Sequence, residues 1–152
     1  MAVLRGICIS ERKGTEKHAI PEAELIEDWG LRDDAHAGKW HRQVSLLGLA
    51  QIEAFRARGA DVDFGAFGEN LIVDGFRMNT LPVGTRLAVG DALLEITQIG
   101  KECHTRCRIY ETMGECIMPR EGVFARVLRG AVIRVGDEVA VLPPAVQKGN
   151  EA

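Results

Sequence analysis

The sequence predicts a mainly β domain, built most simply as a closed β-barrel with two or more short flanking helices. Its 152 residues include 17 glycines and five prolines, which indicates many turns between short elements. The tripeptide Val-Gly-Asp occurs at residues 89–91 and again at 135–137, each time between apolar segments, and predicts a tight turn at both places. A barrel is favoured because closure leaves few free strand edges.

Length and composition predict one domain over residues 1–143, followed by a polar tail at 144–152. The net charge of −3 and the 5% share of aromatic residues argue against nucleic acid or an anionic membrane as partner. We find no signal-peptide pattern and no apolar stretch of membrane-spanning length. We therefore expect a soluble cytoplasmic protein whose four cysteines are thiols or metal ligands.

The first half of the chain predicts short strands, two polar segments and one helix. The strands are expected at residues 3–9, 23–29 and 44–47, and the polar segments at 11–17 and 31–42. Leu49, Ile52 and Phe55 are spaced three apart, which predicts a helix over residues 49–58 that Gly59 ends.

The second half predicts two hairpins with a helix between them. Strands at 85–89 and 92–97 flank the first Val-Gly-Asp turn, and strands at 131–135 and 138–142 flank the second. The intervening helix is expected over residues 119–129, with Pro119 in its first turn and Gly130 at its end. Its apolar face would comprise Val123, Phe124, Val127 and Leu128.

Cys103 is the strongest candidate for chemistry. It follows a predicted strand and is flanked by Lys101, His104 and Arg106, whose positive charge favours the reactive thiolate. A thiolate can attack sulfur, carry a persulfide or ligate a soft metal. The alternatives are a small buried hydrophobic residue or a zinc site, the latter built from Cys103, His104, Cys107 and Cys116. Cys8 lies in an apolar strand and is expected to be unreactive.

Two further motifs offer polar groups that could hold a ligand. Residues 33–43 contain His36, His41 and Arg42, which can hydrogen-bond an oxyanion or move a proton near neutral pH. The competing interpretation is a solvated loop with one core histidine. Glu69 and Asn70 follow two glycines and offer an acceptor and an amide, although a simple turn before a strand explains them equally.

Charge is also uneven along the chain. Basic residues outnumber acidic ones between residues 101 and 134, in an otherwise acidic protein. This bias indicates either an anion-binding pocket or ordinary solvated surface charge.

Taken together, these stretches resemble the MOSC domain, the family named for the C-terminal part of molybdenum-cofactor sulfurases, and in particular its small stand-alone bacterial members. The matching stretches run in family order over nearly the whole chain, at residues 34–38, 41–47, 67–71, 81–84, 89–91, 100–104 and 135–137. One departure is Asp33, which stands where the family usually has glycine. Aspartate tolerates positive φ better than most residues do, at some cost.

The resemblance implies a β-barrel of MOSC type that binds molybdenum cofactor (molybdopterin), with Cys103 carrying a persulfide sulfur or ligating molybdenum. The implied pocket comprises His36, His41, Arg42, Glu69 and Asn70, supported by Lys101, His104 and Arg106. Pyridoxal phosphate is associated with the family only through the desulfurase domain of larger members, for which this chain is too short. A separate cysteine desulfurase or redox partner, and a cofactor or molybdoenzyme acceptor, are therefore expected.

The leading hypothesis is a sulfur carrier, with enzymatic sulfur transfer left open. One alternative is a molybdenum-dependent reductase module that detoxifies N-hydroxylated compounds, and another is a non-catalytic binder of molybdate, tungstate or cofactor. Two geometric expectations follow. His36, His41, Glu69 and Cys103 should approach one cleft, with Cys103 within about 15 Å of a histidine. At least two basic residues from 101–134 should line it.

Overall fold

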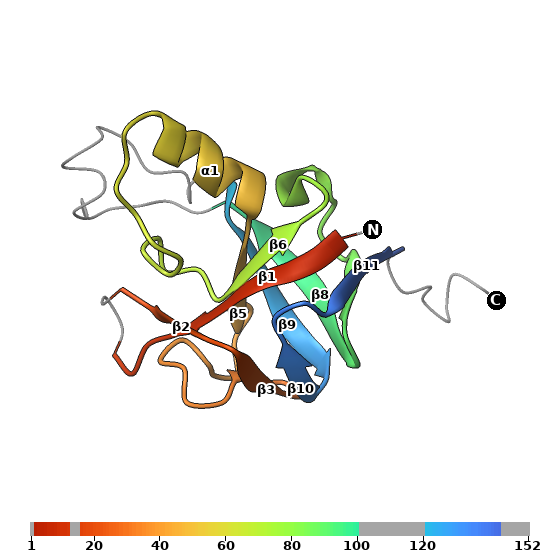
Figure 1. Ribbon diagram of the computed structural model, residues 1–152. Helices are drawn as coiled ribbons and strands as arrows, with labels where there is room; N and C mark the ends of the chain where they lie inside the picture. The colour runs from red at the N-terminus through yellow and green to blue at the C-terminus, as the bar shows by residue number, and fades with distance from the viewer. Residues whose placement is uncertain (1, 13–15, 101–120, 144–152) are drawn as a thin grey trace.

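A closed seven-stranded β-barrel forms the centre of the computed structural model, which describes residues 2–12, 16–100 and 121–143 (Figure 1). Going round the barrel, the strands are β11 (Glu138–Leu142), β7 (Arg86–Val89), β8 (Ala92–Ile99), β9 (Val123–Arg129), β5 (Val44–Gly48), β6 (Leu71–Asp74) and β1 (Ala2–Ile9). The predicted mainly β barrel is confirmed.

Closure depends on β1, which pairs along both of its edges. One edge pairs with β6, and the other pairs first with β11, where Ala2 lies opposite Val139, and then with the short strand β2 (His18–Ile20). The β5–β6 pair is parallel, whereas the other barrel pairs are antiparallel. The long first strand thus removes the free edge that an open sheet would expose.

A small second sheet, of β3 (Glu22–Ile26), β4 (Gly30–Leu31) and β10 (Ala131–Arg134), lies beside the barrel. The prediction of a hairpin over residues 131–142 is wrong, because β10 pairs with β3 whereas β11 pairs with β7 and β1. The tight turn itself is present, since Asp137 N donates to Arg134 O at 3.0 Å. The turn is also bound to Leu4 of β1, because Gly136 N donates to Leu4 O and Leu4 N donates to Asp137 O. The chain therefore passes here from β10 in the small sheet to β11 in the barrel.

The helix predicted over residues 119–129 is also wrong, since residues 123–129 form the strand β9. Residues 119 and 120 lie outside the described ranges. β9 is a central barrel strand between β8 and β5, with residues 123–125 all buried. A strand buried on both faces is a continuous apolar run, which periodicity alone cannot distinguish from a buried helix.

The predicted first helix is confirmed as α1 (Leu49–Ala57), with Ile52 and Phe55 buried and Gly59 at φ 105° just beyond its end. α1 packs outside the barrel against β5 and β6 (Figure 1). The described residues add one 3-10 turn, η1 (Met78–Thr80), and contain no helix long and apolar enough to cross a bilayer.

Two apolar clusters lie on opposite sides of the barrel wall. Leu46 belongs to the cluster inside the barrel, whereas its neighbour Leu47 belongs to the cluster beneath α1, together with Cys8. Successive side chains of a strand point to opposite faces, so one short strand contributes to both clusters. This places Cys8 among apolar groups beneath the helix.

Candidate functional site

The predicted polar segment over residues 31–42 is a loop between β4 and β5, and it carries both candidate histidines. Two backbone hydrogen bonds anchor the loop, from Ala35 N to Ser10 O and from Gly38 N to Trp29 O, both at 2.8 Å. Asp33 has a φ of 68°, which is the left-handed conformation that a glycine adopts without strain. The loop therefore has a positive φ at this position, although the residue there is aspartate and not the glycine usual in the family.

Four residues form a polar group that we call the Lys17 cluster: Ser10, Lys17 and Asp34, which are buried, and His36, which is half-buried. Lys17 Nζ donates to Asp34 Oδ1 at 2.7 Å and to Ser10 Oγ at 3.2 Å, and it lies 2.9 Å from His36 Nδ1. The side chains of Lys17 and Asp34 are both fully buried. Because an ammonium group can only donate, Nδ1 of His36 accepts and its ring proton belongs on Nε2.

Lys17 is a candidate functional residue that the sequence analysis missed. It closes a segment of charged residues that predicted an exposed loop, whereas the structure buries its side chain completely. No local pattern signals this burial, because three strands separate Lys17 in the chain from its partners Asp34 and His36.

Glu69 is completely buried and is linked to Lys17 through the backbone of Gly65. Its two carboxylate oxygens accept backbone N–H groups from Gly65 and Phe67, each at 3.0 Å, and burial raises the pKa of Glu69 to about 7. Gly65 O in turn accepts from Lys17 N at 3.0 Å. At Gly65, with φ 94°, any Cβ would collide with the Lys17 carbonyl, so this turn needs glycine. Glu69 thus holds the turn against which Lys17 rests.

Asn70 is equally buried and connects three segments of backbone. Its Oδ1 accepts from Ser45 N at 2.9 Å, and its Nδ2 donates to Cys8 O at 3.0 Å. These bonds, like those of Glu69, lie within the fold. Cofactor binding by Glu69 and Asn70 therefore stays a prediction.

A second polar group, which we call the Gln98 cluster, lies at the end of β8 and comprises His41, Arg42, Gln98 and Gly100. Gln98 Oε1 lies 2.8 Å from His41 Nε2 and accepts from Arg42 Nε at 3.1 Å, while Gln98 Nε2 donates to Gly100 O at 2.8 Å. The Arg42 guanidinium lies over the ring of Phe124, 5.1 Å from its centroid. The sequence analysis selected His41 and Arg42 but missed Gln98, which no motif marks.

Gly100 is the last described residue before the segment 101–120, and Glu121 is the first after it. The Gly100 N–H donates to Gly122 O at 2.6 Å, so the two ends of the intervening segment meet beside the Gln98 cluster. Outside the described ranges lie Lys101, Cys103, His104, Arg106, Cys107 and Cys116. Their predicted roles, the zinc alternative and the limit of about 15 Å on Cys103 therefore stay predictions.

The two candidate histidines share a loop but belong to different clusters. Trp40 connects them, because its Nε1 donates to His36 O at 2.8 Å and its ring meets that of His41 edge-on, with centroids 5.9 Å apart. Glu69 supports the side of His36, because it binds Gly65 N and Gly65 O in turn accepts from Lys17 N. Among the described residues, no three histidine, cysteine or acidic side chains are arranged to hold a metal ion.

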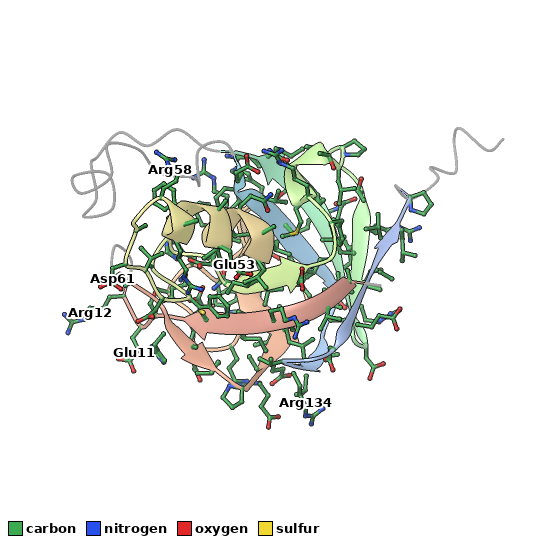
Figure 2. The ribbon with its side chains drawn as sticks, turned by 45° about the horizontal axis from the view of Figure 1, so that its top comes forward. Glu11, Arg12, Glu53, Arg58, Asp61 and Arg134 are labelled. Carbon is green, nitrogen blue, oxygen red and sulfur yellow. The ribbon has the colours of Figure 1, made fainter. Side chains whose placement is uncertain are left out.

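A pocket of about 480 Å³ opens beside His41, lined by the loop, β8 and β9. Of the described basic residues after Lys101, only Arg126 lines it, and Arg126 pairs with Glu95 at 2.6 Å. Arg129 donates to Asp91 O, and Arg134 lies 3.7 Å from Glu22 and projects outward, far from the labelled Arg58 (Figure 2). Arg126 is thus the one basic residue of 121–134 in this pocket, and because residues 101–120 lie outside the described ranges, the expectation of two basic residues in the cleft stays a prediction.

Cys8 matches the expectation of an inert thiol. It is completely buried, and its burial, aided by the nearby Glu69 carboxylate, raises the pKa of the Cys8 thiol to about 12. At neutral pH it is therefore protonated and shielded from reagents.

The sequence model of the MOSC domain matches residues 33–140. Among solved structures, the chain is similar to the YuaD protein from Bacillus subtilis, with a TM-score of 0.78 and 16% identity over 95% of this chain and 98% of that one. It is also similar to YiiM from Geobacillus stearothermophilus, with a TM-score of 0.70 and 18% identity over 93% of this chain and 75% of that one. YiiM from Escherichia coli gives 0.67 and 16%, over 97% and 72%. No curated protein matches the chain.

Proposed function

The chain belongs to the MOSC domain family, and on this premise we propose that it is a sulfur carrier that binds molybdenum cofactor and holds sulfane sulfur on Cys103. The observation that carries the proposal is the Gln98 cluster, which ties His41 and Arg42 to Gly100. Cys103 follows Gly100 by three residues, which span at most about 11 Å of extended chain. A histidine and an arginine are therefore held within reach of the cysteine segment.

Arg42 is the described residue that best fits an anionic cofactor. Its Nε is used by Gln98 and its plane rests on Phe124, which leaves its terminal nitrogens without a partner among the described residues. A guanidinium held in this way can donate two parallel hydrogen bonds to a phosphate. Lys17 suits that role less well, because Asp34 already neutralises it. When bound, the cofactor would supply a metal centre that accepts sulfide.

Loading of Cys103 needs a separate cysteine desulfurase as donor. The Cys103 thiolate attacks the terminal sulfur of the donor's persulfide, so that a new S–S bond forms on Cys103 and the donor's S–S bond breaks. The donor cysteine leaves as a thiolate, and the proton stays on the terminal sulfur. The positive charges of Lys101, His104 and Arg106 favour the attacking thiolate.

Unloading as sulfide consumes two electrons, which a second cysteine of this chain can supply. The thiolate of Cys107 or Cys116 attacks the Cys103 sulfur, a disulfide forms between the two cysteines, and HS⁻ leaves. A redox partner must then reduce that disulfide before the next cycle. The cofactor or a molybdoenzyme is the acceptor of the sulfide.

The test is to incubate the protein with a cysteine desulfurase and cysteine, and then to measure protein-bound sulfane sulfur and molybdenum. We expect Cys103→Ser to lose the sulfane sulfur while keeping its metal, and Cys8→Ala to keep both. Loss of molybdenum in Cys103→Ser would favour the reductase alternative, in which Cys103 ligates the metal. Equal loading of the wild type and Cys103→Ser would contradict the sulfur carrier.

A further inference from the structure

We propose that the pocket beside His41 is a second binding site, for a small, flat, uncharged ligand with an N–H or O–H donor, and that Gln98 prepares His41 to accept that donor. The pocket has a volume of about 480 Å³, which suits a small aromatic molecule. This proposal goes beyond the sulfur-carrier function and does not require Cys103.

The charges that line the pocket are balanced. Lys39 and Arg126 contribute two positive groups, and Asp28 and Glu95 two negative ones. Arg126 is already paired with Glu95 at 2.6 Å, and Asp28 Oδ1 accepts from Gln43 Nε2 at 2.9 Å. A charged ligand would give up hydration here without meeting an excess of opposite charge. The pocket therefore favours an uncharged ligand over an anion or a cation.

Part of the pocket wall is flat and apolar. Trp40 and Val83 line it with 40% and 58% of their surface exposed, and the buried Ile96 of β8 contributes to the same lining. The indole is held in place because its Nε1 donates to His36 O at 2.8 Å. An aromatic ring fixed at its edge offers a ready surface on which a flat ligand can stack.

Gln98 determines which nitrogen of His41 carries the ring proton. Gly100 O can only accept and Arg42 Nε can only donate, so the amide of Gln98 must point its nitrogen at Gly100 and its oxygen at Arg42. The same oxygen lies 2.8 Å from His41 Nε2, which must therefore donate. In neutral His41 this leaves Nδ1 as the acceptor, and Nδ1 has no partner among the described residues.

The backbone of His41 is held as well. Its carbonyl accepts the hydroxyl of Thr97, another residue of the pocket lining. A ring fixed by Gln98 and a backbone fixed by Thr97 present Nδ1 in a defined direction, as a preorganised acceptor for an N–H or O–H group.

The first experiment reads the ring proton directly. Long-range ¹H–¹⁵N spectra of the full chain, at a pH where His41 is neutral, are expected to show the Nε2–H tautomer. Gln98→Glu keeps an acceptor opposite His41 and should retain that tautomer, whereas Gln98→Leu should give a mixture. A wild-type His41 protonated at Nδ1 would overturn the assignment.

The second experiment uses three probes of one shape and different charge: benzamide, benzoate and benzamidinium. We expect benzamide to bind most tightly and to shift the indole resonance of Trp40. Trp40→Ala should weaken benzamide binding about three- to tenfold, as expected for loss of one aromatic stack. Trp29→Ala removes an equally exposed tryptophan outside the pocket lining and should leave binding unchanged.

The outcomes separate this proposal from the proposed function. Tighter binding of benzoate or benzamidinium, or equal losses in Trp40→Ala and Trp29→Ala, would overturn the site. Cys103→Ser should bind benzamide as the wild type does, so failure of the sulfur carrier leaves this result intact. Loss of benzamide binding in Cys103→Ser would show that the pocket is not an independent site.

Discussion

The Lys17 cluster and the Gln98 cluster hold the two histidines of one loop in opposite ways. In the first, a buried ammonium donates to Nδ1 of His36, whereas in the second an amide oxygen accepts from Nε2 of His41. The Lys17–Asp34 pair of the first cluster is fully buried and its contact with His36 half-buried, while the contact of His41 with Gln98 is exposed. The comparison teaches that similar polar contacts serve different ends: burial makes the first a structural core, and exposure leaves the second open to a ligand.

The thiols offer the largest test of this contrast. Cys8 lies on the buried side, where Asn70 Nδ2 binds its carbonyl, and a thiol pKa of about 12 in place of 9.0 leaves roughly a thousandfold less thiolate at neutral pH. We expect Cys103 to be alkylated in the folded protein and Cys8 only after unfolding, as read site by site by mass spectrometry. If Cys103 reacts no faster than Cys8, the sulfur-carrier function is wrong.

The next largest effect is expected from Asp34→Ala, which leaves the buried Lys17 ammonium without its carboxylate. Removing one partner of a buried ion pair costs about 3–5 kcal/mol, so urea unfolding should show a loss of this size. The double variant Lys17→Met with Asp34→Leu should recover part of it, because neither charge remains, although the buried Ser10 N–H still lacks the Asp34 oxygen that accepts it at 3.0 Å.

The control for that prediction is Glu24→Ala, which breaks an exposed ion pair with Arg32 of the same 2.7 Å length. Exposed pairs contribute at most about 1 kcal/mol. Equal losses in Asp34→Ala and Glu24→Ala would show that burial does not distinguish the two kinds of contact here.

The pH dependence of stability probes Glu69. Its pKa is about 7 in the folded chain against 4.5 ordinarily, so the folded state binds the proton more tightly. Unfolding free energy should therefore fall as pH rises from about 4.5 to about 7, by about 3 kcal/mol at most. Urea unfolding at a series of pH values measures this slope, which Glu69→Gln should flatten and Glu53→Gln, on the exposed face of α1, should not. A slope that persists in Glu69→Gln would assign it to another group.

The smallest expected effect compares two amides. Asn70→Ala leaves Ser45 N and Cys8 O buried without their partner, which should cost about 2–3 kcal/mol. Gln98→Ala removes bonds that water can replace and should cost about 1 kcal/mol or less. Thermal or urea unfolding of both variants checks the ranking. A Gln98→Ala loss as large as that of Asn70→Ala would make the Gln98 cluster part of the structural core.

Much of the fold was predictable because local patterns report it. The spacing of Leu49, Ile52 and Phe55 predicted α1 to within one residue of its end, and the first Val-Gly-Asp predicted the β7–β8 hairpin. The second Val-Gly-Asp predicted its turn correctly but not the partners of the strands on either side of it, β10 and β11. A turn is a property of a few adjacent residues, whereas strand pairing is decided by distant ones.

What the sequence by itself determined is the β class, the barrel, the family resemblance and the loop that carries both histidines. What only the tertiary structure decided is which polar groups are buried. Lys17 and Gln98 are ordinary surface-type residues in the sequence, and each becomes the centre of a cluster because strands remote in the chain meet around it. Burial and hydrogen-bond partners depend on neighbours in space, and the partners of Lys17 and Gln98 lie up to 57 residues away in the chain.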